Sequence, residues 1–271
     1  MKFAVVEGER REAEPGLSAA CPACGTAMIA KCGDIKVRHW AHRGRRICDH
    51  WWEPETAWHR DWKNHFPTSW QERLHSSENG EKHIADVKTG RGVVLEFQHS
   101  FLHSDERESR EKFYPKLVWV VDALRRKGDR KQFFASLGSR KRANVPIYSI
   151  PIIDGNYPPS MIEGGALLRD WGACSVPVYF DFGTDEKGDA PNLDTTALWL
   201  LVPRKGDRTA YLLPVPRTEF VRIHLAGEPF EEQCADLVEQ VKDYFRQQAL
   251  GQPRGVGFER YMPRGKRPRR F

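Results

Sequence analysis

The chain has 271 residues, of which 39% are hydrophobic and 30% are charged, and its formal net charge is +6. These values are typical of a soluble globular protein with one main domain and appendages. Apolar runs all fall short of the roughly 18 residues that a membrane span requires. The first residues do not have the pattern of a signal peptide. We therefore expect a cytoplasmic protein that does not interact with membranes.

The first motif along the chain combines two thiols with two imidazoles. Its members are Cys21, Cys24, His39 and His42. The glycine after the second cysteine lets the backbone turn beneath a metal, and the spacing suits a closed tetrahedral site for structural Zn²⁺. A disulfide is disfavoured because no secretory signal precedes the cysteines. We predict a zinc-binding module in residues 1–50. The fourth ligand stays open, since two further thiols lie in the same region: Cys32 and Cys48.

The segment E-T-A-W-H-R-D-W-K predicts a helix with two distinct faces. Glu55, His59 and Lys63 recur every four residues and share one face. Trp58 and Trp62 occupy a neighbouring face, which we expect to point into the core. A solvated surface helix would carry the same charges, so the polar face is interpreted either as a solubility ladder or as one wall of an active site.

Residues 84–98 read as a β-hairpin, with Asp86 on the first strand and Glu96 and Gln98 on the second. Side chains alternate along a strand, so Glu96 and Gln98 point to the same face. Two carboxylates beside a polar group suit a phosphodiesterase that depends on Mg²⁺, or on Mn²⁺ in its place. The competing interpretation is an exposed hairpin with charges on its solvated face.

Further along, residues 104–114 predict a helix capped by Ser104, and the apolar run 117–121 predicts a buried strand. Several strand-like segments and an amphipathic helix over 230–247 follow. Since no nucleophile, metal cluster or phosphate-binding loop is visible among them, we interpret residues 146–250 as a β-rich accessory module.

The last segment, residues 251–271, holds seven Arg or Lys residues and one Glu, so it accounts for the whole net charge of +6. Its Gly, Pro and Arg content predicts a basic disordered tail. Such an arm suits contacts with nucleic-acid phosphates, and a solubilising or protein-docking role is the alternative. The candidate nucleic-acid-binding residues in it are Arg264, Lys266, Arg267, Arg269 and Arg270.

The motifs E-x3-H-x3-K, A-D-V, E-F-Q-x-S, R-E-K-F-Y and L-V-W-V-V, in that order, resemble the CoiA-like competence proteins. The C-x2-C pair followed by H-W-A-H resembles the N-terminal domain of the same family. The resemblance covers about residues 20–125. It implies an α+β or α/β fold, with a zinc ribbon ahead of a PD-(D/E)xK nuclease-like core, a mixed sheet flanked by helices, over residues 51–145.

The resemblance also implies roles for individual residues. Asp86 and Glu96 correspond to the motif carboxylates that hold Mg²⁺, and Glu55 corresponds to a glutamate of the first helix. Gln98 falls where a Lys is usual. Lys63 or Lys88 could supply the missing cation, and we favour Lys63. His59 completes the catalytic set. Candidate nucleic-acid contacts on the helix after the sheet are Arg107, Arg110 and Tyr114.

Two functions follow from these expectations. The first is a metal-dependent nuclease that hydrolyses DNA phosphodiester bonds in DNA processing, recombination, uptake or defence. The second is a catalytically weak DNA-binding protein that assists a recombinase, or another DNA-processing protein, during competence. In both, single- or double-stranded DNA is the expected partner.

Overall fold

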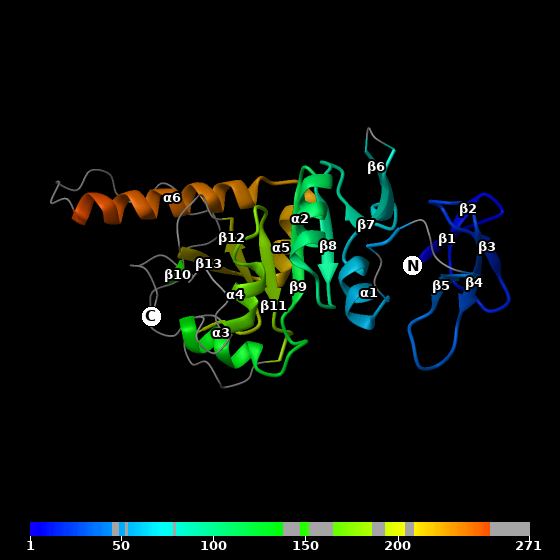
Figure 1. Ribbon diagram of the computed structural model, residues 1–271, viewed down its shortest axis with the longest axis horizontal. Helices are drawn as coiled ribbons and strands as arrows, with labels where there is room; N and C mark the ends of the chain where they lie inside the picture. The colour runs from blue at the N-terminus through cyan, green and yellow to red at the C-terminus, as the bar shows by residue number, and fades with distance from the viewer. Residues whose placement is uncertain are drawn as a thin grey trace. The chain divides into compact units, whose positions relative to one another are not determined.

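The computed structural model describes most of the chain, in two compact units, Met1–Glu228 and Pro229–Phe271. The described residues are 1–44, 49–51, 54–77, 80–137, 147–151, 165–185, 193–203 and 209–249. They form a mixed α and β structure with two sheets and six helices (Figure 1). The basic tail, with its five candidate nucleic-acid-binding residues, lies outside the described residues, as does Cys48.

The N-terminal module is a five-stranded antiparallel sheet in the order β2-β1-β3-β4-β5. Its strands are β1 (Phe3–Val6), β2 (Glu9–Glu12), β3 (Ser18–Ala20), β4 (Ala27–Lys31) and β5 (His39–His42). Met28 and Trp40 are almost completely buried and form its small core together with Cys21. A core this small gives little stability by itself, so a bound metal ion would add to the stability of the module. The cysteines beside the core are candidate ligands for such an ion.

The second sheet has eight strands in the order β10-β13-β12-β11-β9-β8-β7-β6. It is mixed, because β9 runs parallel to both β8 and β11 whereas the other neighbours are antiparallel. The strands are β6 (Gln71–Ser76), β7 (Lys82–Lys88), β8 (Val94–Gln98), β9 (Leu117–Asp122), β10 (Tyr148–Pro151), β11 (Val178–Asp181), β12 (Leu198–Val202) and β13 (Thr209–Val215). The predicted hairpin over 84–98 and the predicted strand over 117–121 correspond to β7, β8 and β9.

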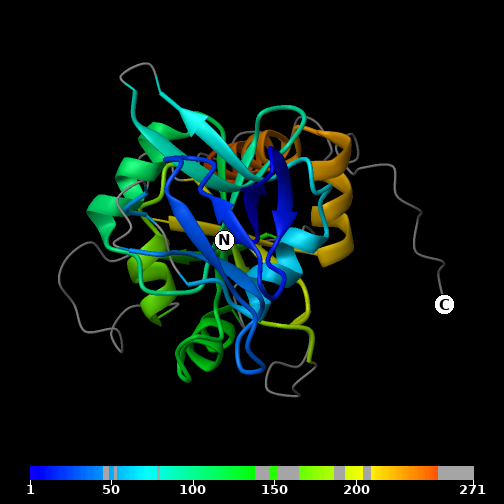
Figure 2. The same cartoon turned by 90° about the vertical axis from the view of Figure 1, so that its right-hand side faces the viewer.

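Helices of the first unit pack on both faces of this sheet: α1 (Ala57–Asn64), α2 (Ser104–Phe113), α3 (Asp129–Leu137), α4 (Gly165–Trp171) and α5 (Arg217–Ala226). The second unit contains α6 (Phe230–Ala249). Trp119 of β9 packs in the main hydrophobic cluster with Phe133 of α3 and Leu167 of α4. On the opposite face, Phe220 of α5 contacts Trp62 of α1. Figure 2 shows α1 and α5 on one side of the sheet, and α2 and α4 on the other.

A boundary between a nuclease-like domain and an accessory module was expected between residues 145 and 146. The main sheet continues across this position. Strands β10 to β13 extend the same sheet that carries the predicted hairpin, so residues 147–215 contribute half of its strands. The continuous apolar runs of these strands reflect burial on both faces of a large sheet. The helix predicted over 230–247 is α6, although its unit begins at Pro229. Within the described residues, no helix combines the length and apolarity needed to cross a bilayer.

Asp181, at the end of β11, connects this extension of the sheet to α1. Its Oδ2 accepts hydrogen bonds from the indole N–H groups of Trp58 and Trp62, both at 2.9 Å. Its Oδ1 pairs with Arg217 and accepts the backbone N–H of Gly183. Asp181 is 2% exposed and accepts from four donor groups. It therefore connects the end of β11 with α1 and with the start of α5.

We expect Asp181→Ala to lower the free energy of unfolding by about 3 kcal/mol or more, because it leaves buried donors and a guanidinium without their acceptor. Chemical denaturation of the variant measures this loss. Asp105→Ala, at an exposed position of α2, is the matched control and should stay within about 0.5 kcal/mol of the unmodified protein. A loss below about 1 kcal/mol at Asp181 would show that the connection is unimportant.

Candidate functional site

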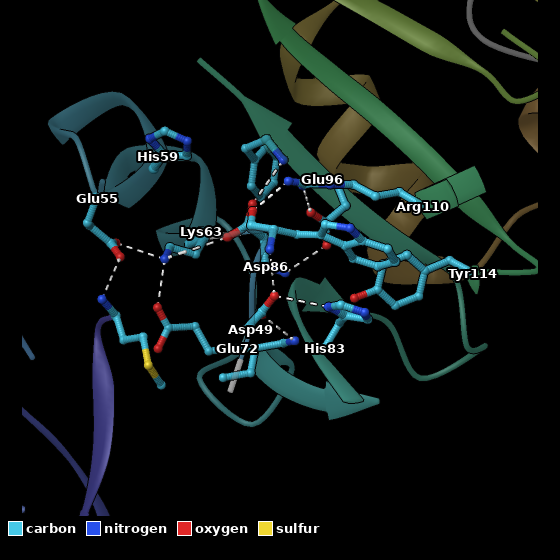
Figure 3. A pocket seen from close by; sticks show the side chains of 14 residues that line it. Asp49, Glu55, His59, Lys63, Glu72, His83, Asp86, Glu96, Arg110 and Tyr114 are labelled. Atoms are coloured by element: carbon cyan, nitrogen blue, oxygen red, sulfur yellow. Dashed lines mark hydrogen bonds and ion pairs between the residues drawn. The ribbon is translucent and has the colours of Figure 1, made fainter. Parts of the chain in front are cut away.

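A cavity of about 60 Å³, measured as space open to water centres, lies where β7 and β8 separate (Figure 3). One water needs about 10 to 15 Å³ on this measure, so the cavity has room for an ion with several waters. Its lining is dominated by ionisable groups. The lining residues are Met1, Asp49, Trp51, Glu55, His59, Lys63, Glu72, His83, Ile84, Asp86, Glu96, Phe97, Arg110 and Tyr114.

Asp86 and Glu96 lie opposite each other at the point where regular pairing of β7 with β8 gives way. The ladder pairs Val87 with Leu95. One residue further, Glu96 Oε1 accepts the backbone N–H of Asp86 at 3.4 Å, and Asp86 Oδ2 accepts the backbone N–H of Phe97 at 3.0 Å. In a regular antiparallel ladder, backbone N–H groups donate to backbone carbonyl oxygens. Here the side-chain carboxylates of Glu96 and Asp86 accept them instead. The structure places both side chains in the lining of the same cavity.

Both carboxylates resist ionisation. Burial, followed by the charge of Asp86, raises the pKa of Glu96 well above its usual range, although Arg110 at 3.2 Å opposes this. Burial also raises the pKa of Asp86, and Lys63 only partly offsets it. Asp86 keeps 24% of its side chain exposed, whereas Glu96 keeps 8%. A divalent cation would relieve the repulsion between these groups, and Asp86 is the one that solvent reaches more easily.

Lys63 projects from α1 into a cage of carboxylates. Its Nζ lies 2.8 Å from Glu55, 2.9 Å from Glu72 and 3.9 Å from Asp86 Oδ1, as the dashed lines in Figure 3 mark. Burial alone would lower the pKa of Lys63, but Glu72 and then Glu55 raise it above the ordinary value. Lys63 therefore remains an ammonium ion, which can bind negative charge but cannot act as a base.

The start of α1 differs in one respect from its prediction. Thr56 is the N-cap, so Glu55 precedes the helix rather than lying on it. Thr56 Oγ1 accepts the backbone N–H of His59, while His59 Nδ1 accepts the backbone N–H of Thr56, which forms a capping box. Glu55 still reaches Lys63, because the residue before the cap turns toward the same face. His59 is buried and lines the cavity.

Helix α2 contributes Arg110 to the cavity and the residue after the helix contributes Tyr114, whereas Arg107 lies outside the lining. Arg110 bonds Glu96, Glu106 and the carbonyl of Trp51. Since Arg110 and Tyr114 are buried, they position groups inside the site. Arg107 is also buried, and it donates to the carbonyl of Asp170. The helix begins after His103 as N-cap, with no side-chain capping bond, so Ser104 is its first residue rather than its cap.

Gln98 does not line the cavity. Its amide donates to the carbonyl and hydroxyl oxygens of Ser100 at 3.1 and 3.3 Å. Lys88, the second cation considered, has its Nζ 3.1 Å from His75 Nδ1. Lys63 is therefore the lysine that the fold brings beside Asp86.

The raised pKa of Glu96 predicts how the stability of the protein depends on pH. A carboxyl group whose folded pKa is raised costs stability above that pKa, and the cost disappears as pH falls toward the unfolded value. Without added Mg²⁺ or Mn²⁺, we expect Glu96→Gln to be more stable than the unmodified protein at pH 7. The difference should shrink as the pH is lowered from 7 toward 5. Thermal unfolding across this range measures it, and a gap that widens in acid would contradict the assignment.

Three ionisable side chains of the cavity, those of Asp49, Glu72 and His83, were not identified by motif. Asp49 lies in a segment where the sequence analysis singled out only Cys48 as a possible metal ligand. Glu72 sits at the start of β6 with a φ of +46°, and it accepts the backbone N–H groups of Lys2 and Phe3. His83 occupies β7 three residues before Asp86. A buried acid with positive φ has no sequence signature, because the strain depends on tertiary contacts.

The N-terminal module brings together three of the four predicted zinc ligands. Ligand atoms of Cys21, Cys24 and His42 lie within 4.8 Å of one another, and Cys24 Sγ lies 3.5 Å from His42 Nε2. Burial opposes the thiolate form of Cys24, but hydrogen bonds, first from Thr26, lower its pKa to about 6. His39 is not part of this group, and its Nδ1 bonds the carbonyl of Val37.

We expect Cys24→Ser to lose one equivalent of bound zinc per chain relative to the unmodified protein, because two remaining ligands cannot complete a tetrahedral site. Elemental analysis of purified protein measures this difference. Cys174→Ser, at a buried thiol of the second sheet's core, is the control and should keep its zinc. Equal zinc in Cys24→Ser and in the unmodified protein would exclude the site.

The fold and sites define a mixed α and β protein with a candidate Cys₂His metal site in its N-terminal module. Residues 18–50, which include this site, match the family model described as competence protein CoiA, N-terminal domain. The match covers the N-terminal module alone, which is therefore similar to the N-terminal domain of the CoiA family. Comparisons with curated proteins and with solved structures gave no match.

Proposed function

We propose that this protein is a metal-dependent nuclease that hydrolyses DNA phosphodiester bonds in a competence-related process. The observation that carries the proposal is the placement of Asp86 and Glu96 in one cavity, with the ammonium of Lys63 3.9 Å from Asp86. The N-terminal family match supports the competence-related part. Hydrolysis itself is inferred from the chemistry of the cavity.

The donor set fits Mg²⁺ or Mn²⁺. Both ions prefer carboxylate oxygens and keep several waters, and the cavity offers such oxygens together with room for water. The raised pKa values of Asp86 and Glu96 mark a place where a divalent charge is favourable. When bound, such an ion would polarise a phosphoryl oxygen and lower the pKa of its water.

The residues of the chain would divide the remaining work. Lys63 stays charged and can stabilise the negative charge that develops on the phosphate. Glu55 and Glu72 orient its ammonium, and Arg110 orients Glu96. The small cavity admits an ion but not a nucleotide, so DNA would approach from the side on which Asp86 is exposed.

One observation favours a second function, that of a DNA-binding accessory with weak or no catalysis. Gln98 stands where the related nucleases usually carry Lys, and its amide is engaged by Ser100. An amide orients by hydrogen bonds but cannot supply positive charge. Such a protein would still bind DNA and assist a recombinase or another DNA-processing protein.

Cleavage assays with plasmid and with single-stranded DNA distinguish the two functions. The zinc-loaded protein is assayed in Mg²⁺, in Mn²⁺ and without either ion, and DNA binding is measured on the same preparation. Cleavage that requires the divalent ion supports the nuclease. Salt-sensitive DNA binding without cleavage in either ion supports the accessory function. Absence of both would contradict the two proposals together.

A further inference from the structure

A second cluster of metal-ligating side chains lies beside the cavity, separate from the Cys₂His group. Ligand atoms of His50, Glu81 and His83 lie within 4.8 Å of one another. His83 comes from β7, Glu81 from the residue before that strand, and His50 from the segment that precedes α1. We propose that these three side chains bind a transition-metal ion of the Zn²⁺ type.

The central ligand, His83, is held as a metal-bound histidine would be. Its Nδ1 lies 3.0 Å from Asp49 Oδ1, and Asp49 is itself fixed by the backbone N–H groups of Trp51 and Ile84. The imidazole is 2% exposed and stacks on Trp51, with ring centroids 3.3 Å apart. A carboxylate on one nitrogen fixes the tautomer and presents the other nitrogen, Nε2, as a metal ligand.

Nε2 of His83 then points at a second carboxylate, since Glu81 Oε1 lies 2.9 Å away. A neutral imidazole has one N–H, so it cannot donate to Asp49 and Glu81 at once. A positive charge is therefore favourable between His83 and Glu81, and His50 brings a third ligand, with ring centroids 5.1 Å from His83.

Two imidazoles and one carboxylate select the kind of ion. Mg²⁺ prefers oxygen ligands, whereas Zn²⁺ and its transition-metal neighbours accept this mixed set. Tetrahedral Zn²⁺ with bonds of about 2.0 to 2.1 Å needs ligand atoms about 3.4 Å apart. The ligand atoms of this cluster lie within 4.8 Å of one another, so some of them must move closer to reach that spacing. His50 and Glu81 are exposed and can move, while His83 is buried and stays fixed. Three protein ligands leave one position for water.

Such an ion would tether the segment before α1 to the start of β7. Asp49 and His83 both line the cavity, so this tether would also hold two of its walls. We therefore expect Zn²⁺ to raise the unfolding temperature through this site, independently of any cleavage activity. The proposal does not depend on the nuclease function.

The test compares zinc binding by the full chain in five proteins: the unmodified protein, His50→Ala, Glu81→Gln, Cys24→Ser and the double variant His50→Ala with Cys24→Ser. Calorimetric titration after removal of bound metal gives stoichiometry and affinity. Both ligand positions are exposed, so folding should be preserved. His103→Ala and Glu108→Gln, at exposed positions of or beside α2, are the matched controls.

We expect two zinc equivalents in the unmodified protein and in the controls, one in Cys24→Ser, and none in the double variant. His50→Ala and Glu81→Gln should weaken one binding event by about 100-fold or more, since even an outer partner of a ligand is worth 10- to 100-fold. The proposal is overturned if either variant binds zinc like the unmodified protein. It is equally overturned if the double variant retains the equivalent that Cys24→Ser retains, because His83 would then hold a proton rather than a metal.

Discussion

Asp86→Asn is expected to abolish cleavage that depends on Mg²⁺ or Mn²⁺, with a loss of at least about 1,000-fold in rate. A metal-bound reaction centre contributes several kcal/mol of charge stabilisation, and each 1.36 kcal/mol corresponds to a tenfold change. Asparagine retains an oxygen that can accept the backbone N–H of Phe97, so the local hydrogen bond survives. Burial already disfavours the charged form of Asp86, and the variant should fold normally.

The control for this variant is Asp105→Asn on α2, whose side chain is exposed and outside the cavity. It should retain both cleavage and stability. The DNA affinity of Asp86→Asn, measured without divalent ions, should remain unchanged or rise slightly because a negative charge is removed. Full activity in Asp86→Asn would remove the carboxylate from the reaction.

Lys63→Met should produce the largest loss of stability among the cavity residues, about 3 to 5 kcal/mol. The substitution keeps the apolar stem but leaves Glu55 and Glu72, whose side chains are 4% and 5% exposed, without their shared cation. For a domain of this size the loss corresponds to a decrease of about 10 °C in unfolding temperature. Equilibrium denaturation and thermal unfolding measure it.

A double variant separates this loss from simple packing. Combining Lys63→Met with Glu72→Gln removes one of the buried charges and should restore part of the stability, which a double-mutant cycle detects. Lys112→Met, at an exposed position of α2, is the matched control and should have an effect within about 0.5 kcal/mol. If Lys63→Met and Lys112→Met are equally stable, the ammonium is not the centre of the network.

Local patterns in the sequence predicted the elements that hold the site. Buried and less buried residues alternate along β7 as the sequence pattern indicates, whereas all five residues of β8 are buried. The tryptophans at positions 58 and 62 face the sheet as the helical spacing indicates, since both donate to Asp181 at the end of β11. Such signals are local, because side-chain direction follows from the period of a strand or a helix. The same reasoning grouped Cys21 and Cys24 with His39 and His42, and the structure brings together three of these four residues, without His39.

Long-range contacts were not predictable in this way. Glu72 is positioned in the site by a backbone with positive φ and by hydrogen bonds to the first residues of the chain. Asp49 is positioned by a turn that carries no motif and by the backbone N–H of Ile84. The extension of the sheet by β10 to β13 depends on strand pairing between residues far apart in sequence, which hydrophobic pattern alone does not specify. Gln98 was expected on the same face as Glu96, but it does not line the cavity, and its amide donates to Ser100.

The measurement closest to the central claim is a crystal of the unmodified protein soaked in Mn²⁺, with data collected for anomalous scattering. We predict one anomalous peak in the cavity, within about 2.5 Å of a carboxylate oxygen of Asp86 and of a carboxylate oxygen of Glu96. A cavity without a peak, or a peak that contacts neither carboxylate, would contradict it.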